Sequence, residues 1–225
     1  ADLNGVPCAW LVPDSDLKAV DHPAIARDVV RYVGDAVAVV VAESRYEAED
    51  ALSGITVDYE QLPVVIDPEE AAQPGAPQLH DDAPGNQAFL WSVAGGDADA
   101  AFDAAEVTVS ERIVHQRLIP NAMEPRSAVA QWTASMGELT VWSTSQNPHI
   151  ARFLMSVVTD VPEHKIRVIA TEVGGGFGSK IPFYADEVIA AFCAMQTERP
   201  VKWTATRSEG YLATIHGRDH VQHVE

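Results

Sequence analysis

The chain has 225 residues and carries 33 acidic side chains against 15 basic ones, a formal net charge of −18. This charge disfavours nucleic acid and anionic membrane surfaces as partners, because both repel an acidic protein. Apolar residues make up 47% of the chain, which is enough for hydrophobic cores. No apolar run approaches the roughly 20 residues of a membrane-spanning helix, so we expect a globular protein without a membrane span.

The first 72 residues have the pattern of a small mixed module. Residues 32–42 are a turn followed by a strongly apolar run. Ser44 and Glu47 then have the spacing of a capping box, which predicts a helix that ends near Gly54. Ala48, Ala51 and Leu52 would form its apolar stripe. Residues 55–59 alternate between apolar and polar side chains and predict the next strand.

Residues 73–87 form the one clear linker. Three prolines, two glycines and several polar side chains exclude a long helix or a central strand there. The sequence therefore predicts a first domain over residues 1–72, a linker over 73–87 and a second domain over 88–225.

The second domain begins with short elements. We expect a strand to start within residues 88–95, a short alanine-rich helix over 97–104, and an alternating strand within 106–118. Residues 129–132 and 139–142 predict a hairpin whose turn lies at 135–137. Next, Asn147 is a suitable N-cap and Pro148 a suitable first residue for a helix through Thr159. The side chains expected to face inward on this helix are Ile150, Phe153, Leu154 and Val157.

Residues 173–180 (VGGGFGSK) contain four glycines in five positions, between a predicted strand at 165–170 and a helix predicted over Pro182–Met195. Glycine permits positive φ and a close approach of the backbone to a ligand. The following helix N-terminus offers free N–H groups and a positive dipole end to an anion. The spacing fits neither a P-loop nor a dinucleotide fingerprint. The alternative interpretation is a tight turn without a ligand.

These motifs resemble those of the molybdenum hydroxylases, the xanthine oxidase and aldehyde oxidase superfamily. The glycine-rich segment is similar to the GGGFGxK loop of that superfamily. Residues 143–149 (STSQNPH) are similar to its S/T-x-Q-x-P-H segment, and residues 123–130 (MEPRSAVA) to its EPR-x-A-V-A segment. Residues 200–204 (PVKWT) resemble its PVKW strand, and residues 207–209 (RSE) resemble the R-x-E segment that follows that strand. All of them occur in the order of the superfamily.

The resemblance implies a molybdenum–molybdopterin cofactor, in its cytosine dinucleotide form. Gly175, Gly176, Phe177 and Gly178 would cradle it, and the backbone of Phe177 would approach the molybdenum. Gln146 would be both a cofactor-binding and a catalytic residue, because its side chain would point at the oxo ligand of the metal. Copper, where present in the carbon monoxide dehydrogenases, is held by a cysteine loop later in the large subunit.

The resemblance also implies the fold class and the partners. The expected fold is α+β: the C-terminal part of a hammerhead α/β domain, followed by the first part of the molybdopterin-binding domain. The partners would be an Fe–S small subunit, an FAD-binding medium subunit, a second copy of the large subunit and a small-molecule substrate. Cys8 and Cys193 cannot supply the four thiolates of an Fe–S cluster, so we expect no Fe–S cluster in this chain, and such sparse use of cysteine fits a cytoplasmic location. The resemblance also implies that FAD is bound by another subunit and not by this chain.

The function implied is oxidation of a small substrate with water as the oxygen source, most similar to carbon monoxide dehydrogenase. In purine-oxidising members a glutamate follows the loop lysine, and Ile181 here argues against a purine. The first alternative is an aldehyde or N-heterocycle dehydrogenase of the same superfamily. The second is a catalytically inactive interaction module. The general-base glutamate of the superfamily has no counterpart here, so we expect the chain to be inactive alone.

Several charged residues allow two interpretations. Lys180 either neutralises cofactor charge or lies along the surface with its stem buried. We expect Arg126 to be a structural ion-pair partner of Glu124. His216, His220 and His223 have an imperfect spacing for zinc, and the favoured interpretation is an exposed strand.

Overall fold

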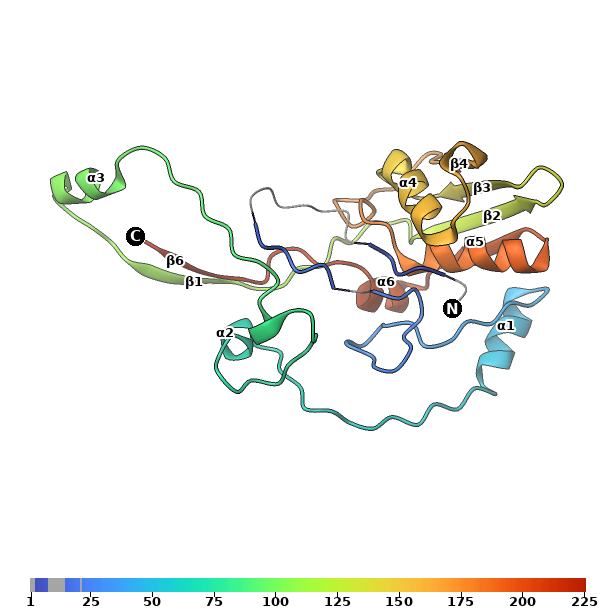
Figure 1. Cartoon of the computed structure of the whole chain (residues 1–225), viewed down its shortest axis with the longest axis horizontal. Helices are drawn as coiled ribbons and strands as arrows, with labels where there is room; N and C mark the ends of the chain where they lie inside the picture. Colours follow the sequence, from blue (N-terminus) through green and yellow to red (C-terminus); the bar gives the residue numbers. More distant parts are fainter. Residues whose placement is uncertain (1–2, 8–14, 21) are drawn as a thin grey trace. The chain divides into compact units, whose positions relative to one another are not determined.

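The computed structural model describes residues 3–7, 15–20 and 22–225 (Figure 1). Its contacts divide the chain into two compact units, and each unit gathers stretches that are far apart in sequence. The first unit comprises Ala1–Ala9, Asp21–Gln61 and Pro120–Ile215; the second comprises Trp10–Val20, Leu62–Ile119 and His216–Glu225. The linear division at residues 73–87 follows the order of the sequence, and it remains a prediction.

A four-stranded sheet organises the first unit, in the order β4-β3-β2-β5. Strand β3 pairs antiparallel with β2 and parallel with β4, and β5 pairs antiparallel with β2. The β2–β3 turn is closed by a hydrogen bond from Gly137 N to Thr133 O of 2.9 Å. The predicted hairpin and the strands expected at 165–170 and in PVKW are therefore confirmed. The strands are β2 (Ser127–Thr133), β3 (Glu138–Ser143), β4 (Ile166–Ile169) and β5 (Val201–Thr204).

One face of this sheet forms the hydrophobic core. Ala130 of β2 lies opposite Val141 of β3, and both are buried, as is Leu139. Helix α5 (Ala185–Thr197) packs against β2, helix α4 (Pro148–Thr159) packs against β4, and the two helices contact each other. Small alanines on β2 and α5 let the helix approach the strand closely, because no long side chain separates their backbones.

Helix α4 has the predicted bounds, but the prediction of its buried face was wrong. Leu154 is buried as expected, whereas Ile150, Phe153 and Val157 are exposed. The buried stripe is instead Ala151, Leu154, Met155 and Val158. Both stripes are apolar and both have the i, i+3, i+4, i+7 spacing, so periodicity alone could not distinguish them.

Helix α5 begins three residues later than the prediction from Pro182, at Ala185. The start is set by Glu187, whose carboxylate accepts a hydrogen bond of 3.1 Å from the backbone N of Tyr184. A glutamate at the third helical position that reaches back in this way satisfies one of the free N–H groups of the helix end. Residues 181–184 are thereby left as a connection between the glycine-rich segment and α5.

Helix α1 (Arg45–Leu52) has the predicted capping box. Ser44 N donates to Glu47 Oε2 (2.9 Å), and Glu47 N donates to Ser44 Oγ (3.3 Å). No residue of α1 is buried, so its predicted apolar stripe does not enter a core. The remaining helical elements of the first unit are the short η2 (Glu163–Lys165) and α6 (Arg207–Ala213).

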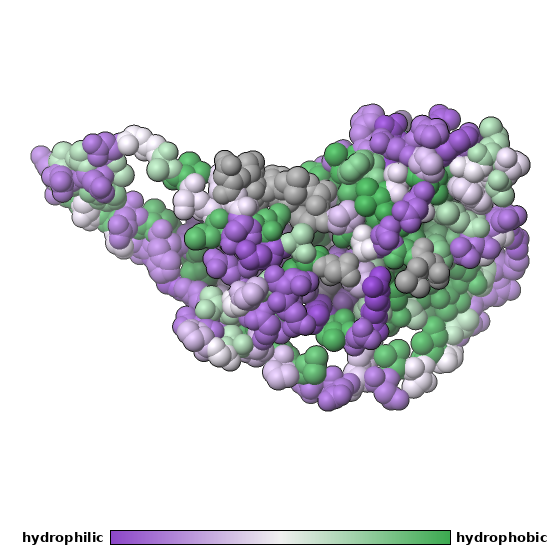
Figure 2. All heavy atoms as spheres, viewed as in Figure 1, coloured by the Kyte–Doolittle hydropathy of each residue, from purple (hydrophilic) through white to green (hydrophobic). Residues whose placement is uncertain are grey.

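The strands predicted at 55–59 and within 88–95, and the apolar run at 35–42, are not strands in the structure. A strand needs a ladder of backbone pairs with a neighbour. Here Ala36 O accepts one hydrogen bond from Ala26 N and Ala88 O one from Lys18 N, and no ladder follows. Many large apolar side chains of these segments therefore remain exposed, and Figure 2 shows apolar residues on the surface among polar ones.

The second unit contains a two-stranded antiparallel ribbon of β1 (Glu111–His115) and β6 (His220–Val224). Its helices are α2 (Pro68–Ala71), η1 (Pro84–Asn86) and α3 (Ala98–Ala104). Asp97 is the N-cap of α3, and its side chain accepts a hydrogen bond of 3.0 Å from Ala100 N. The predicted short helix is confirmed. The exposed strand expected for the three histidines holds His220 and His223, whereas His216 lies before it and is not in a strand.

Among the described residues, no helix is both long enough and apolar enough to cross a membrane.

Neighbouring positions on α4 test which stripe of the helix is buried. We expect Leu154→Ala to lower the free energy of unfolding by about 2–5 kcal/mol, because this side chain is 3% exposed and its loss leaves a cavity. Phe153→Ala removes a larger side chain that is 51% exposed, and should cost less than about 1 kcal/mol. Urea unfolding of the two variants measures the difference, and the reverse ranking would contradict the assigned face.

Candidate functional site

Gln146 lies between the end of β3 and the start of α4, and its side chain is bound to the glycine-rich segment. Its Oε1 atom accepts hydrogen bonds from Gly178 N (3.1 Å) and Lys180 N (3.2 Å). Its own backbone N donates to Lys180 O (2.8 Å). Residues 173–180 are called the glycine loop below. Gln146 and the glycine loop, which are far apart in sequence, are thus held together by these hydrogen bonds.

Gly176 is required by this contact. A Cβ atom at this position would lie 2.2 Å from Oε1 and 2.4 Å from Cδ of Gln146, which is closer than any real contact. Gly176 is buried beneath the glutamine side chain. Its role is therefore to leave room for Gln146, and not only to let the chain turn.

Phe177 adopts a backbone conformation that is rare for its type. Its φ is +52°, between Gly175 and Gly178, which both have a φ of +94°. A bulky residue in the left-handed region is strained by about 1–2 kcal/mol, and such strain concentrates at functional sites. The residue is also 74% exposed, so its side chain is not held there by a core. The strained residue is the one that the motif places at the tip of the loop.

Glu124 holds the two ends of the glycine loop. Its Oε2 atom accepts hydrogen bonds from Gly174 N (2.7 Å) and from Lys180 Nζ (2.8 Å). Burial alone would raise the pKa of Glu124, but the hydrogen bonds from Lys180 and Gly174 outweigh it and lower the pKa. Lys180 is 3% exposed and pairs with Glu124, so the interpretation of a surface side chain with a buried stem was wrong. Neutralisation of cofactor charge by Lys180 remains a prediction.

Arg126 has a different partner from the one expected. It pairs with Asp186 at the start of α5 (2.6 Å) instead of Glu124. Its guanidinium lies 3.9 Å from the ring centre of Tyr184 and 5.2 Å from that of Trp203. Stacking of this kind suits the planar, weakly hydrated guanidinium. Nε and Nη1 of Arg126 are buried and have no hydrogen-bond partner within the described part of the chain.

Tyr184 supports the middle of the loop. Its hydroxyl donates to Ser179 O (2.6 Å) and accepts from Ile215 N (3.3 Å). Burial raises the pKa of Tyr184, so the hydroxyl stays protonated and remains a donor. Spacing along the chain did not predict these contacts of Tyr184, because a tyrosine before a helix has no distinctive capping signal.

Glu187 joins the strand that leads to Gln146 with the helix that follows the loop. Its carboxyl group accepts from Ser143 Oγ at the end of β3 and from Tyr184 N. Desolvation raises the pKa of Glu187, against the lowering effect of both hydrogen bonds and of Arg126. The capping spacing before an apolar helix was the available signal for this residue.

Arg207 fixes the segment that carries Glu124. Its guanidinium donates to Asn121 Oδ1 (2.9 Å), Ala122 O (2.7 Å) and Met123 O (2.8 Å). The R-S-E motif therefore has a structural reason, which sequence alone did not reveal. Arg207 holds the backbone immediately before Glu124, and Glu124 holds the glycine loop.

The site presents hydrogen-bond donors outward. Because Oε1 of Gln146 is already engaged, its Nε2 group is the part left to bind a ligand, and Nε2 donates to no described residue. The N–H of Phe177 likewise has no acceptor among the residues that the structure describes. The structure therefore brings together all five predicted site residues, Gln146, Gly175, Gly176, Phe177 and Gly178. Such a surface suits a ligand with electron-rich oxygens.

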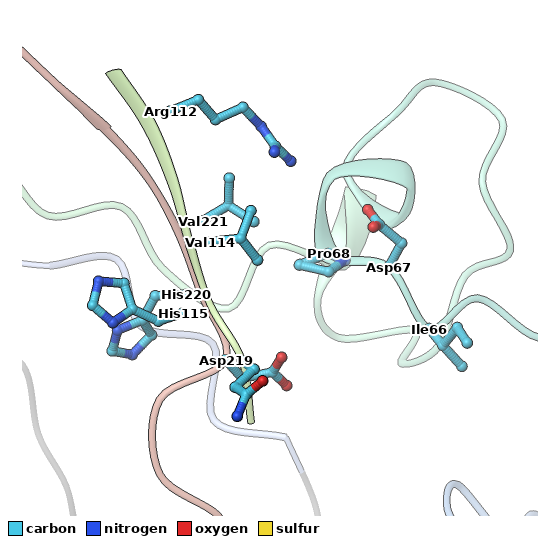
Figure 3. Close-up of a pocket in the computed structure, with 10 residues that line it drawn as sticks. Ile66, Asp67, Pro68, Arg112, Val114, His115, Asp219, His220 and Val221 are labelled. Carbon is cyan, nitrogen blue, oxygen red and sulfur yellow. The ribbon is translucent and has the colours of Figure 1, made fainter. Parts of the chain in front are cut away.

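Two hollows lie away from this site. One, of about 380 Å³, is in the second unit beside β1 and β6 and includes Asp67, Arg112 and His115 (Figure 3). The other, of about 400 Å³, lies between α4 and β4 and includes His149, Arg152 and Arg167. Neither includes the glycine loop. No group of three or more potential metal ligands occurs among the described residues.

Glu187 predicts a pH dependence of stability. A carboxyl group whose pKa is raised in the folded state stabilises the fold fully below its ordinary value of 4.5 and progressively less as the pH rises towards the folded value. Glu187→Gln cannot ionise and can still contact Ser143 and Tyr184. We expect its stability relative to wild type to increase between pH 4 and about pH 7, as urea titrations would show. A difference that is constant or decreases over that range would contradict the assignment.

Gly176→Ala should displace Gln146 from the glycine loop. Because a flexible side chain can turn away, the expected loss of stability is only about 1 kcal/mol, the scale of a lost hydrogen bond. The side-chain amide resonance of Gln146 should shift in NMR spectra. Gly210→Ala is the matched control, since a Cβ there meets no atom within 4 Å and alanine favours helix α6. An unchanged Gln146 resonance in Gly176→Ala would contradict the contact.

Two family models match the chain. The model described as "Molybdopterin cofactor-binding domain" matches residues 79–225, and the model described as "Aldehyde oxidase and xanthine dehydrogenase, a/b hammerhead domain" matches residues 10–63. The predicted fold class, a hammerhead domain followed by a molybdopterin-binding domain, is thereby confirmed.

Several known proteins are similar over nearly the whole chain. The large chain of carbon monoxide dehydrogenase from Hydrogenophaga pseudoflava is 36% identical, covering 97% of this chain and 28% of the relative. Quinoline 2-oxidoreductase from Pseudomonas putida 86 has a TM-score of 0.83 at 31% identity, covering 97% of this chain and 27% of that one. A structure of the Cu,Mo-CO dehydrogenase has a TM-score of 0.83 at 36% identity, covering 91% and 27%.

The chain thus spans about a quarter of the length of the relatives that it matches. The glycine loop and Gln146 lie within the matched region. From these matches, and from the arrangement of the loop, the chain belongs to the molybdopterin cofactor-binding domain family.

Proposed function

We propose that this chain is part of the large subunit of a molybdenum-dependent hydroxylase or dehydrogenase. The full-length protein would oxidise a small substrate with water as the oxygen source. The observation that carries the proposal is the clamped amide of Gln146, whose Oε1 is held by two loop N–H groups while Nε2 faces outward. An interaction module would need neither this clamp nor a strained phenylalanine at the loop tip.

The residues of the site fit a molybdopterin cofactor. Gln146 and the N–H of Phe177 are uncommitted donors at the metal end, and Gly175, Gly176 and Gly178 let the loop backbone lie close to a bulky group. The charge of Lys180 is balanced by Glu124, so the loop would bind chiefly through neutral donors. When bound, the cofactor supplies the redox chemistry, and the protein supplies binding and orientation.

The substrate class that we propose is carbon monoxide or a similarly small molecule. Support comes from the similarity to carbon monoxide dehydrogenase large chains and from Ile181, an apolar residue that is 50% exposed directly after the loop lysine. An apolar side chain there cannot bind the polar edge of a purine. The alternative is an aldehyde or N-heterocycle, favoured by a comparable similarity to quinoline 2-oxidoreductase.

The wider assembly is part of the same proposal. An Fe–S subunit and an FAD subunit would accept the electrons. A second copy of the large subunit, the cytosine dinucleotide form of the cofactor and a cytoplasmic location complete it. Copper would accompany molybdenum if the substrate is carbon monoxide.

Metal analysis of the intact complex, purified from its source, tests the proposal. Molybdenum and copper at about one each per large subunit, together with turnover of carbon monoxide, are the expected result. Molybdenum without copper would select the aldehyde or N-heterocycle alternative. A complex produced with its maturation machinery that holds no molybdenum would contradict the enzyme proposal and leave the interaction module.

A further inference from the structure

We propose that the ion pair between Glu124 and the buried Lys180 is a positioning device for Gln146. By joining the two ends of the glycine loop, it fixes the N–H groups that turn the oxygen of the Gln146 amide inward and the nitrogen outward. The inference deepens the function proposed above and rests on it for its catalytic consequence. Glu124 and Lys180 are positioning residues, since neither needs to touch substrate or cofactor.

One carboxylate oxygen of Glu124 joins the two ends of the glycine loop. Glu124 Oε2 accepts from Gly174 N at 2.7 Å and from Lys180 Nζ at 2.8 Å. Glu124 N also donates to Gly174 O at 3.2 Å. A Cβ on Gly174 would lie 2.6 Å from Cβ of Glu124, so only glycine permits this approach. The start and the end of the loop therefore share one anchor.

The backbone of Lys180 is hydrogen-bonded to Gln146. Lys180 N donates to Gln146 Oε1, and Lys180 O accepts from Gln146 N. The same residue is held at its ammonium group by Glu124. A shift of the lysine therefore moves both hydrogen-bond partners of Gln146 at that position.

The glycine loop also sets the orientation of the Gln146 side-chain amide. Two N–H groups meet at Oε1, so the reversed amide would place an NH2 group against two donors and would lose both hydrogen bonds. The loop thereby decides that the outward group of Gln146 is a donor. A ligand at this position must present an acceptor.

The effect of the ion pair on the position of Gln146 is distinct from its effect on stability. A buried ion pair is often replaceable by apolar residues without loss of stability, whereas removing one partner leaves an uncompensated charge. Lys180 is 3% exposed and Glu124 is its acidic partner, so the single and the double substitution should differ sharply. Stability and positioning can therefore be separated by experiment.

The test uses the full-length large subunit in its complex. Glu124→Gln alone should fold poorly, because it strands the lysine charge. The double variant Glu124→Gln with Lys180→Met should recover a melting temperature within a few degrees of wild type. Its crystal structure should nevertheless show Gln146 Oε1 beyond hydrogen-bond distance of Lys180 N. The kcat for carbon monoxide should fall about 10- to 100-fold with KM little changed, as expected for a small misplacement of a site residue.

A matched control is available in the same unit. Lys165 and Glu138 form a Lys–Glu pair at 3.3 Å that does not contact the loop. Lys165→Met with Glu138→Gln should leave both the Gln146 position and kcat unchanged. If the double loop variant fails to fold, Gly174→Ala serves instead, because its Cβ would push Glu124 away while both charges remain.

A Gln146 amide that keeps its place in the loop variants would overturn the inference, whatever the activity. The crystallographic position of Gln146 does not depend on turnover. A wild-type complex without molybdenum or carbon monoxide oxidation would therefore contradict the proposed function, while the positioning inference would still be decided by the structures of the variants.

Discussion

The structure of the site depends on the hydrogen bonds between Gln146 and the glycine loop. Two loop N–H groups converge on one amide oxygen, and this is possible only because Gly176 has no Cβ in the space that the glutamine occupies. The loop is thus shaped to fit a side chain of the same protein. The outward-facing donors of the candidate site, the Nε2 group of Gln146 and the N–H of Phe177, follow from that fit.

Around this contact, polar side chains brace the loop from several directions. Arg207 holds the backbone before Glu124, Glu124 holds both loop ends, and Tyr184 holds Ser179. Glu187 ties the end of β3 to the start of α5. Buried networks of this kind are costly unless every member is satisfied, and when satisfied they hold a single geometry. The motif residues in sequence are therefore mainly a frame for Gln146.

The four-stranded sheet explains why these residues meet. Gln146 follows β3, the glycine loop follows β4, and these two strands are parallel neighbours. Their carboxyl ends lie at the same edge of the sheet, which is the usual place for a ligand site in such an arrangement. The segments of the candidate site are loops, while the packed alanines and leucines of the core beneath them supply rigidity.

The sequence by itself determined the elements whose signals are local: the α1 capping box, the β2–β3 hairpin, the bounds of α4, and the glycine loop with Gln146 as its companion. Tertiary structure decided the rest, because the answer lay in a partner distant in sequence. Two apolar stripes on α4 were equally periodic, and only packing selected Leu154 over Phe153. Apolar runs at 35–42 and 55–59 formed no strand, because strands need a neighbour. Lys180 pairs with Glu124 in place of Arg126, which pairs with Asp186, since an ion pair is set by spatial proximity and burial, which spacing along the chain does not encode.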